Sequence, residues 1–596
     1  MTEEKRLKRL PYGNADFTSF LAKRLYFVDK TSYIRTIEEK GDFLFFIRPR
    51  RFGKTLFLSI LEDYYDINKK TQFDTLFNGT AIHNNPTEEK NKYLIFKLNF
   101  SLVNPGTSSV EKAFLNYIKD SVSDFLTKYA TLLDIDIDKA EADVNSRETA
   151  SDVMIAFFKY CKRKKQKLYV IIDEYDNFAN TILAASGEEK YHLITHGEGF
   201  LRAFFNVIKG GTTEGSAPIA RFFMTGVSPI TLDDVTSGFN IAENISLDHD
   251  VQEMLGFTHD EVETILNYYK QAGLIPHSVP ELMEIMHNWY NGYRFSKRVQ
   301  NQLFNPTQIL YFIKEYMKNA EPPQEMIDRN LRVDYHKLRH LIVIDQKGTP
   351  KTNGNFSKLK EIIETGSIQS TLVSGFPIRM VAAPENFVSL LYYFGLLTIS
   401  DTTPGDAVIL KIPNETIRHL YYDYIKDTYR ETGSFALDPD KYSQLMENMA
   451  FDGQWQELIT FIADQMKSSM GLRDLITGEK TVQAFLNVYL GLSNLFIIHP
   501  EKELNKGFAD LVLEPFIGKY PAIKYSYMIE IKYMKAIPEG RKIPEKQLRE
   551  LREKAQNQLA QYSLDEKYRK TIEKTTLVKL ILIFSGHQLV EMIDVQ

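Results

Sequence analysis

Residues 43–61 read FLFFIRPRRFGKTLFLSIL, and their layout decides the fold of the first part of the chain. An apolar run, a basic turn and a second apolar run follow one another, as in a strand, a loop and a helix. Backbone N–H groups converge at such a helix N-terminus and bind phosphate, and Lys54 and Thr55 after Gly53 are suited to reach phosphates and Mg²⁺. The pattern G-x-x-x-x-G-K-[ST] is nevertheless incomplete, because Arg48 stands where its first glycine is expected.

The first 250 residues alternate short apolar runs with longer amphipathic stretches. Nearly continuous apolar runs are typical of strands in a parallel sheet that is covered on both faces. The stretches between them are long enough for crossover helices, so the sequence predicts an α/β domain. The predicted strands are 43–47, 93–100, 168–173 and 220–226.

Two further strand ends add polar groups to the predicted phosphate site. LYVIIDEYD (168–176) places Asp173 where an acid would bind Mg²⁺ through water, with Glu174 next to it to activate the attacking water. Thr225, or nearby Ser228, would sense the γ-phosphate from the neighbouring strand. An acidic surface turn is the structural alternative for Asp173 and Glu174, but it does not explain the upstream Gly-Lys-Thr. An ordinary strand-ending turn around Gly226 stays open as the alternative for Thr225 and Ser228. Together these elements predict an ATP site with Mg²⁺.

The middle of the chain has a mainly helical pattern. Thr258 and Glu261 have the spacing of a capping box at a helix start. Residues 382–400, followed by a turn-rich TTPGD and AVILKIPN, have the layout of a winged-helix unit. The polar stretch 431–443 is the best linker candidate. We therefore predict three domains, with the bounds 1–257, 258–435 and 436–596.

The last 150 residues show a second α/β pattern. The predicted elements are a helix over 481–495, strands over 508–515, 525–534 and 577–584, and a charged helix over roughly 544–563.

Within this second pattern, Asp510 precedes one apolar strand, and Glu530 and Lys532 occupy alternate positions of another. Side chains at i and i+2 of a strand share a face, so Glu530 and Lys532 point the same way. Two carboxylates and a carbonyl make a hard-oxygen site for Mg²⁺ or Mn²⁺, and the lysine would orient water or stabilise charge on phosphorus. The alternative is a solvated strand face with a cross-strand ion pair.

Composition excludes several other classes of protein. The chain has 596 residues, a net charge of -5 and one cysteine, Cys161, so a disulfide framework and a thiolate zinc cluster are excluded. A surface for nucleic acid must then be a local patch. The N-terminus has no apolar targeting segment, and no later run is long enough to cross a membrane, so we expect a cytoplasmic protein without membrane contact.

The first 430 residues carry motifs that resemble the bacterial AAA-ATPase-like proteins, which are P-loop ATPases related to AAA+ enzymes. The motifs are FIRPRRFGKT, YVIIDEYDN, FFMTGVSPI, ISL, GFTHDEV, WYNGYRF, FNP and KIPNETI. In that family the loop commonly reads R-P-R-R-x-G-K-[ST], which makes Arg48 a family feature. The resemblance implies that Lys54 and Thr55 hold nucleotide and Mg²⁺, that Asp173 and Glu174 form the Walker B pair, and that Arg294 is a candidate sensor arginine.

The order of elements over about 475–590 resembles the PD-(D/E)XK nuclease superfamily, in the form fused to these ATPases. Gly507 to Asp510 match the G-x-x-D motif, and Gln558 matches the glutamine of the family's helix. The resemblance implies catalytic roles for Asp510, Glu530, Lys532 and Gln558, and makes Glu479 a candidate third acid.

These observations predict an ATPase whose nucleotide state gates or positions a Mg²⁺-dependent nuclease. The nucleotide would be bound by Arg51, Gly53, Lys54, Thr55, Asp173 and Thr225, and the metals by Thr55 and Asp173 at one site and by Asp510 and Glu530 at the other. The expected partner is nucleic acid, DNA in the first place, and a homo-oligomer stays open. The alternative is a nucleotide-dependent signalling switch or scaffold whose C-terminal domain binds partners without cleavage. The roles of Arg48, Arg50 and Arg51 are also open: they add charge around the phosphates or pair with acids elsewhere in the fold.

Overall fold

The computed structural model describes a large part of the chain, in two compact units. One unit comprises residues 1–341 and 369–413, and the other residues 342–368 and 414–596. The described residues are 7–103, 109–177, 199–213, 217–229, 240–331, 358–359, 361–362, 365–376, 380, 383–431, 438–468, 478–505, 507–536 and 543–595. The three predicted domain boundaries stay a prediction, and much of the proposed linker 431–443 lies outside the described residues.

The first unit is built on a five-stranded sheet with the order β2-β3-β4-β1-β5. All neighbouring strands in it are parallel. The predicted α/β fold is confirmed, and the four predicted strands agree with the observed ones to within one residue at each end. The strands are β1 (Phe43–Ile47), β2 (Leu94–Asn99), β3 (Leu168–Asp173), β4 (Ile219–Gly226) and the short β5 (Glu243–Asn244).

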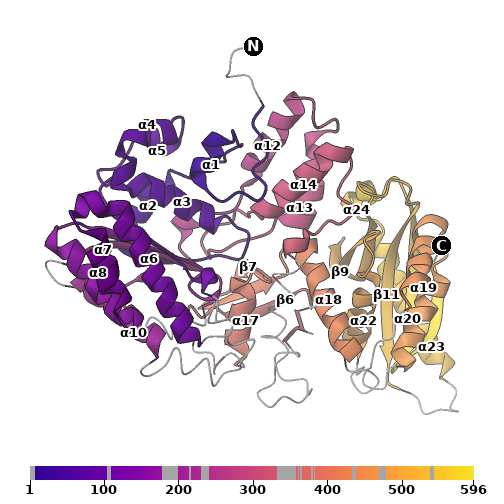
Figure 1. Cartoon of the computed structure of the whole chain (residues 1–596). Coiled ribbons are helices and arrows are strands. Elements are labelled where there is room, and N and C mark those ends of the chain that lie inside the picture. The colour runs from indigo at the N-terminus through magenta and orange to yellow at the C-terminus, as the bar shows by residue number, and fades with distance from the viewer. Residues whose placement is uncertain are drawn as a thin grey trace. The chain divides into compact units, whose positions relative to one another are not determined.

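The first unit also contains the following helices, several of which are labelled in Figure 1. They are α1 (Phe17–Ala22), α2 (Tyr33–Lys40), α3 (Lys54–Tyr65), α4 (Phe73–Leu76), α5 (Ala81–Asn84), α6 (Val110–Leu133), α7 (Ile137–Asn145), α8 (Ala150–Arg163), α10 (Phe200–Thr213), α12 (His259–Gln271), α13 (Val279–Tyr290), α14 (Pro306–Asn319) and α17 (Pro384–Tyr393), with 3₁₀ turns η2 (Ile67–Gln72), η3 (Phe100–Leu102) and η4 (His249–Val251). The predicted capping box begins α12, because Thr258 accepts from the N–H of Glu261 and the Glu261 side chain accepts from the N–H of Thr258.

A small three-stranded sheet with the order β6-β8-β7 follows. Helix α17 leads into β7 (Thr398–Thr402), which pairs antiparallel with β8 (Ala407–Lys411) across the polar turn expected from the sequence. The third strand, β6 (Ser367–Thr371), was not predicted. These elements have the order that led to the winged-helix prediction, which itself stays a prediction.

The second unit holds a five-stranded sheet with the order β13-β12-β11-β10-β9. Strands β11 and β12 are parallel and the other neighbours are antiparallel. The three predicted strands are confirmed, but the predicted helix is too long: α22 ends at Leu490, Gly491 caps it, and β9 begins at Phe496. The strands are β9 (Phe496–Leu504), β10 (Gly507–Pro515), β11 (Tyr525–Met534), β12 (Thr576–Ser585) and β13 (Gln588–Asp594).

Each face of this sheet packs against helices of the same unit (Figure 1). Helices α19, α20 and α22 bury the face that carries Leu511 and Ile529, and α23 and α24 bury the face that carries Val512 and Met528. The helices are α18 (Glu415–Glu431), α19 (Pro439–Glu447), α20 (Gln456–Ser468), α22 (Glu479–Leu490), α23 (Glu545–Tyr562) and α24 (Glu566–Thr571), with a π-helical turn, η6 (Asn448–Asp452).

Strands β10 and β11 diverge part-way along their length. Their pairing spans Leu511–Leu513 and Tyr527–Ile529, whereas β11 stays paired with β12 as far as Met534. Strand β10 stays paired with β9 as far as Gly507. Backbone groups at the point of divergence therefore need other hydrogen-bond partners, and polar side chains meet there.

Partly buried Glu514 of β10 predicts a pH-dependent stability of the second unit. His499 and Lys502 lie 3.0 Å and 2.9 Å from its carboxylate. Burial alone would raise the pKa of Glu514, but these two partners outweigh it and lower the pKa from 4.5 to about 2. The folded state thus keeps Glu514 ionised at a pH where the unfolded chain is protonated, so this stabilisation is present above pH 4.5 and is lost as the pH falls toward 2.

We expect Glu514→Gln to lower the free energy of unfolding at neutral pH by about 2–3 kcal/mol. The variant should also lose most of the difference in stability between neutral and acidic pH that this carboxylate contributes. Urea unfolding followed by circular dichroism over that pH range measures both effects. Equal slopes against pH in the parent and the variant would contradict the assignment.

Candidate nucleotide and nuclease sites

The basic turn after β1 has the backbone of a phosphate-binding loop. Gly53 adopts a left-handed conformation, with φ 96°, and helix α3 begins at the next residue. The Lys54 ammonium is buried and donates to the carbonyls of Arg48 and Pro49, both at 3.0 Å. Burial lowers the pKa of Lys54. The loop therefore holds its lysine inside the turn, at the position where a phosphate would compete for it.

Two predicted metal-site residues lie in direct contact. The Thr55 hydroxyl donates to Asp173 at 2.8 Å, which joins the start of α3 to the end of β3. Asp173 is 1% exposed, burial raises its pKa, and its other oxygen, Oδ1, has no hydrogen-bond partner in the described structure. A hydroxyl and an unsatisfied buried carboxylate oxygen are the donors that Mg²⁺ takes beside nucleotide phosphates, so the residues fit this ion.

The turn after β3 contains Glu174, which has an unusual backbone conformation, and Asp176, which ties the turn to the end of β4. Glu174 has a φ of 53°, which is unusual for a residue other than glycine. Asp176, two residues on, is buried and accepts from the backbone N–H groups of Val227 and Ser228. A Cβ on Gly226 would lie 2.4 Å from the ring of Tyr175, so only glycine allows this turn to approach β4. The DEYD and TGVS motifs thus hold each other in place and leave Glu174 near Asp173.

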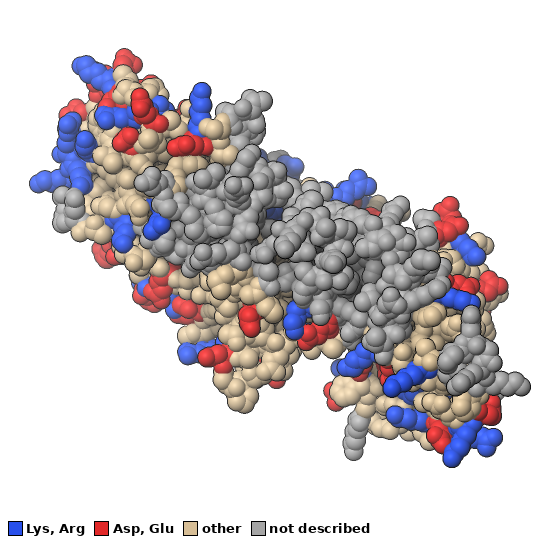
Figure 2. Space-filling model, turned by 90° about the horizontal axis from the view of Figure 1, so that it is seen from below, with Lys and Arg blue, Asp and Glu red and all other residues tan. Residues whose placement is uncertain are grey.

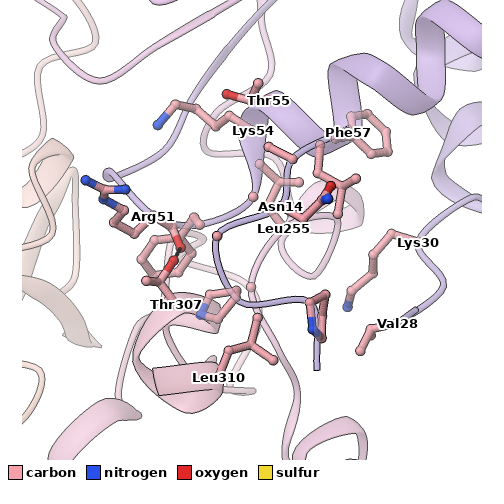
Figure 3. A pocket seen from close by; sticks show the side chains of 18 of the residues that line it. Asn14, Val28, Lys30, Arg51, Lys54, Thr55, Phe57, Leu255, Thr307 and Leu310 are labelled. Atoms are coloured by element: carbon pink, nitrogen blue, oxygen red, sulfur yellow. Dashed lines mark hydrogen bonds between the residues drawn. The ribbon is translucent and has the colours of Figure 1, made fainter. Parts of the chain in front are cut away.

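A cavity of about 560 Å³ opens beside this loop. Figure 3 shows Lys54 and Thr55 on one side of it and Lys30 with Val28 on another. Polar lining residues are Arg50, Arg51, Lys54, Thr55, Asn99, Ser101, Asp173, Glu174 and Asn177; apolar ones include Phe20, Tyr26, Phe27, Val28, Phe57, Ile60, Leu255, Phe257 and Ile265. A lining that combines charged and polar groups with apolar and aromatic side chains suits a ligand with both phosphates and a flat ring.

Several lining residues were not predicted from the sequence. The N-terminal stretch 11–15, Lys30 and Asn99 all border the cavity. Lys30 is tied to Glu261 of α12 at 2.7 Å. Asn99 ends β2 beside Asp173, so the same strand-end argument that selected Asp173 would have found it. No local pattern marks residues 11–15, because long-range folding alone brings them there.

Two other predicted residues have structural partners instead. The Thr225 hydroxyl donates to the carbonyl of Phe46 at 2.7 Å, which ties β4 to β1, and Thr225 is not among the residues that line the cavity. The Arg294 guanidinium donates to the carbonyls of Ser296, Lys297 and Ser400 and to the side chain of Gln300. It does not line the cavity either, so the geometry supports a tie between chain segments and not a sensor.

Arg48, the residue in place of the first glycine, points away from the cavity. It is 1% exposed, and its guanidinium donates to the carbonyls of Ile47, Ser246 and Val251. The same group lies between the rings of Phe46 and Phe295, at 4.2 Å and 4.4 Å from their centres. Burial lowers its pKa to about 10. Arg48 therefore packs beneath the loop and does not contribute charge to the phosphate side.

This difference between two arginines of one loop gives a paired prediction. We expect Arg48→Leu to lower the melting temperature, because it removes three hydrogen bonds and the cation between two rings. Arg51→Gln should instead weaken ATP binding by about 5- to 10-fold at an unchanged melting temperature, since Arg51 lines the cavity. Differential scanning fluorimetry and titration calorimetry separate the two effects. Unchanged ATP affinity in the Arg51 variant would leave Arg51 with a structural role.

In the second unit, the predicted acid-acid-lysine cluster comes together where β10 and β11 diverge. Asp510 accepts from the backbone N–H of Ile531 at 2.7 Å and so takes the place of a ladder hydrogen bond. The Lys532 ammonium lies 2.7 Å from Glu530 and 3.7 Å from Asp510. The sequence prediction that these three side chains share one site agrees with this geometry.

The cluster is largely buried, and one of its carboxylate oxygens has no hydrogen-bond partner in the described structure. Glu530 is fully buried, and its Oε1 has no hydrogen-bond partner in the described structure. Burial and the neighbouring charge of Asp510 raise the pKa of Glu530. Burial would lower the pKa of Lys532, but the two carboxylates raise it overall. A buried unsatisfied carboxylate oxygen next to Asp510 fits a divalent cation. Among the described residues, however, no group of three or more His, Cys, Asp or Glu side chains is placed to hold a metal.

Two more acids lie around this cluster. Glu479 begins α22, and burial together with the charge of Asp510 raises its pKa. Glu501 of β9 was not predicted; it has a φ of 51° in the strand beside Asp510. Buried Gln483 of α22 donates to the carbonyl of Asp510 and to the Glu501 carboxylate. The left-handed residue interrupts the alternation of β9, and this irregularity is what a sequence pattern does not show.

The predicted helix glutamine lies on α23. Gln558 donates to the hydroxyl of Tyr562 at 3.3 Å, one turn on, and its Oε1 has no hydrogen-bond partner in the described structure. A Cβ on Gly507 would lie 2.4 Å from the Tyr562 ring, so the glycine of the G-x-x-D motif lets β10 approach α23. Gln558 thus lies on the helix that packs over this part of the sheet.

On the face shown in Figure 2, the charged side chains of the described residues do not gather into one patch. Figure 2 shows acidic and basic side chains interspersed over the coloured atoms of the view from below.

The helices that the structure describes include none with the length and apolar character to span a membrane.

Comparisons with known proteins support both halves of this arrangement. Residues 11–236 match a family of predicted AAA-ATPases, and residues 477–592 match the PD-(D/E)XK nuclease superfamily. The chain therefore combines an AAA-ATPase-like domain with a C-terminal domain of the PD-(D/E)XK nuclease superfamily. The two resemblances found in the sequence are confirmed over these ranges.

The individual relatives say less about the function of this chain than the two family matches do. A protein of Azotobacter chroococcum mcd 1, described as an uncharacterized protein in the vnfD 5' region, is 25% identical over 313 residues. The chain spans about half the length of this relative, since the match covers 52% of each. A structure of the Aeropyrum pernix ORC1 protein in complex with DNA aligns with 67% of this chain and 93% of that chain, at 10% identity and a TM-score of 0.26. That score is too low to show a shared fold.

Proposed function

We propose that the protein binds and hydrolyses ATP and that its nucleotide state gates or positions a metal-dependent nuclease. The phosphates would lie on Gly53, Lys54 and Arg51, with Mg²⁺ at Thr55 and Asp173. Glu174 would take the proton of the attacking water. The support is the hydrogen bond from Thr55 to Asp173, with an unsatisfied buried oxygen on Asp173 beside a cavity of suitable size.

The nuclease reaction would be the in-line attack of water on a phosphodiester bond. Asp510 and Glu530 would hold Mg²⁺ or Mn²⁺, which supplies charge stabilisation when bound. Lys532 would orient the water or stabilise the charge that develops on the phosphate oxygens, and Gln558 would help position the strand. The observation that carries this proposal is the convergence of Asp510, Glu530 and Lys532, two of them buried, where β10 leaves β11.

One observation favours the alternative, a nucleotide-dependent switch without cleavage. The Lys532 ammonium already lies against Glu530 and near Asp510, and no third metal-binding side chain joins them within the described part of the chain. In such a protein the C-terminal domain would bind nucleic acid or a protein partner and leave it intact.

A cleavage assay distinguishes the two functions. The full-length protein is incubated with plasmid DNA, linear DNA and RNA, with Mg²⁺ or Mn²⁺, and with or without ATP. Metal-dependent cleavage that changes with ATP supports the gated nuclease, and cleavage that ignores ATP removes the gating. Absence of cleavage in every condition favours the switch. DNA as the preferred partner, a homo-oligomeric state and a cytoplasmic location remain parts of the proposal.

A further inference from the structure

Arg50 is a partly buried arginine of the phosphate loop and lines the nucleotide cavity. The positively charged side chains among the described lining residues are Lys30, Arg50, Arg51 and Lys54. Lys30 is held by Glu261 at 2.7 Å, and the Lys54 ammonium lies inside the turn, where phosphate would meet it. The positions of the two arginines therefore decide where further positive charge surrounds the phosphates.

Arg51 lies toward α14 and the N-terminal stretch 11–15. Its carbonyl accepts from the hydroxyl of Thr307 at 3.2 Å, in the first turn of α14 (Figure 3). Burial and Asp328 raise the pKa of Tyr12 to about 12, and the charge of Arg51 works against this rise. Both Thr307 and Tyr12 line the cavity, so Arg51 acts on the side of the cavity that these two segments form.

The charge of Arg50 acts on a different set of residues. Burial lowers the pKa of Lys54, and the charge of Arg50 adds to this effect. Burial raises the pKa of Asp176, and Arg50 works against that rise. Asp176 is buried in the turn that also carries Glu174, which lines the cavity together with Arg50. Arg50 therefore lies on the side where the turn after β3 brings its acids to the phosphate loop.

The backbone of the loop supports this separation of the two arginines. Arg51 adopts a left-handed conformation, with φ 68°, so the chain changes direction directly after Arg50. The residue before Arg50 is Pro49, whose carbonyl accepts from the Lys54 ammonium at 3.0 Å. The Arg50 side chain thus starts one residue from the carbonyl that a phosphate oxygen would replace as the partner of Lys54.

We propose that Arg50 is a catalytic residue of ATP hydrolysis and acts within its own chain. The proposal rests on the ATPase function proposed above. In that reaction the oxygen of water bonds to the γ-phosphorus and one proton of the water passes to Glu174. The bond from the γ-phosphorus to the bridging oxygen breaks, and its electron pair leaves with ADP. Arg50 donates hydrogen bonds to the oxygens on which negative charge grows in the transition state.

The charge of Arg50 should affect the rate of hydrolysis more than the affinity for ATP. Asp176 already interacts with Arg50 before nucleotide binds, so exchange of this acid for a phosphate of bound ATP gains little free energy. Charge that develops only in the transition state has no such prior partner. An interaction that strengthens only there raises kcat and leaves the affinity for the substrate nearly unchanged.

Kinetics and the binding of a transition-state analogue test this role in the full-length protein. We expect Arg50→Gln to lower kcat by about 10²- to 10³-fold and to change the Kd for ATP by less than about 3-fold. ADP with Mg²⁺ and aluminium fluoride imitates the γ-phosphoryl group during transfer. By titration calorimetry the parent should bind ADP more tightly when aluminium fluoride is present. Arg50→Gln should lose this gain and bind ADP alone like the parent.

Three variants serve as comparisons. Arg51→Gln should weaken ATP binding but keep the gain from aluminium fluoride, and Arg50→Lys should recover part of kcat, because it keeps the charge without the planar fork of donors. Arg163→Gln, at an exposed arginine of α8 that does not line the cavity, should change neither quantity. Melting temperatures show whether each variant is folded, and Arg50→Lys supplies the same comparison if Arg50→Gln is destabilised.

A mixing experiment tests whether Arg50 acts within its own chain. A mixture of Arg50→Gln and Glu174→Gln should hydrolyse ATP no faster than the two variants measured separately. Restored hydrolysis in the mixture would overturn the proposal, because it would mean that one copy supplies the arginine to another. An equal gain from aluminium fluoride in Arg50→Gln and the parent, or an unchanged kcat, would overturn it as well.

Failure of this proposal is distinguishable from failure of the ATPase function. Hydrolysis by the parent with an unchanged kcat in Arg50→Gln removes the catalytic role of Arg50 and keeps the ATPase. A parent that neither binds nor hydrolyses ATP removes both.

Discussion

Replacing Lys532 by methionine should reduce cleavage of nucleic acid by about 10²- to 10³-fold. This is the loss typical when one group that stabilises transition-state charge is removed. Lys532 is the cation within reach of both Glu530 and Asp510 in the described cluster, and methionine keeps most of its volume. The measurement is initial rates of cleavage of a labelled oligonucleotide at saturating Mn²⁺. Cleavage rates equal to those of the parent would exclude a catalytic role for Lys532. They would also contradict the assignment of nuclease activity to this cluster.

Folding of the variant must be checked, since breaking a buried ion pair costs about 3–5 kcal/mol when the remaining charge stays unpaired. Glu530 has a raised pKa already and would take up a proton without its partner, which limits that cost. Glu530→Gln/Lys532→Met removes both charges and should be folded and inactive. Lys524→Met, at an exposed lysine just before β11, is the matched control and should cleave normally.

Replacing Lys54 by alanine should weaken ATP binding by about 10- to 100-fold and abolish hydrolysis. A charge-assisted hydrogen bond to phosphate is worth about 1.5–3 kcal/mol, which corresponds to that range. Lys54 is buried at the start of α3, where its ammonium donates to two loop carbonyls. In the ATP complex we expect phosphate oxygens to replace these carbonyls as its hydrogen-bond partners. Titration calorimetry and phosphate release measure the two effects. A variant that binds and hydrolyses ATP like the parent would exclude this loop as the nucleotide site.

Two comparisons sharpen this result. Asp173→Asn should keep most of the affinity for ATP and lose hydrolysis, because Asp173 would act through the metal and not on the nucleotide itself. Lys112→Ala, at an exposed lysine of α6, should change neither. Loss of affinity in both Lys54→Ala and Lys112→Ala would point to general charge attraction in place of a specific site.

Sequence patterns were sufficient for the strands that carry the sites. Long apolar runs ending in Asp173 or containing Glu530 could be recognised because periodicity and strand-end chemistry are local properties. The two family resemblances then assigned the polar residues on these strands to candidate sites. The strand β9, which contains mixed polar and charged residues such as Glu501 and Lys502, was missed because its pattern does not alternate regularly.

Side-chain direction was the part that sequence reasoning could not supply. Thr225 lies next to the end of the predicted strand, yet its hydroxyl donates to the carbonyl of Phe46 on the neighbouring strand. Arg294 lies in the WYNGYRF motif that suggested a sensor, yet its guanidinium donates to nearby carbonyl groups. Both outcomes depend on which distant segments pack beside a residue, and a local pattern contains no information about these segments.

The slot that holds Arg48 has a consequence for protein engineering. A consensus approach would repair the loop by restoring the missing glycine. In this chain Arg48→Gly would leave a cavity between Phe46 and Phe295 and would remove the three hydrogen bonds that Arg48 donates to carbonyls. The variant with the complete motif would therefore be less stable than the parent. Agreement with the motif is therefore a poor guide to the stability of this protein, because the residues around position 48 pack against an arginine.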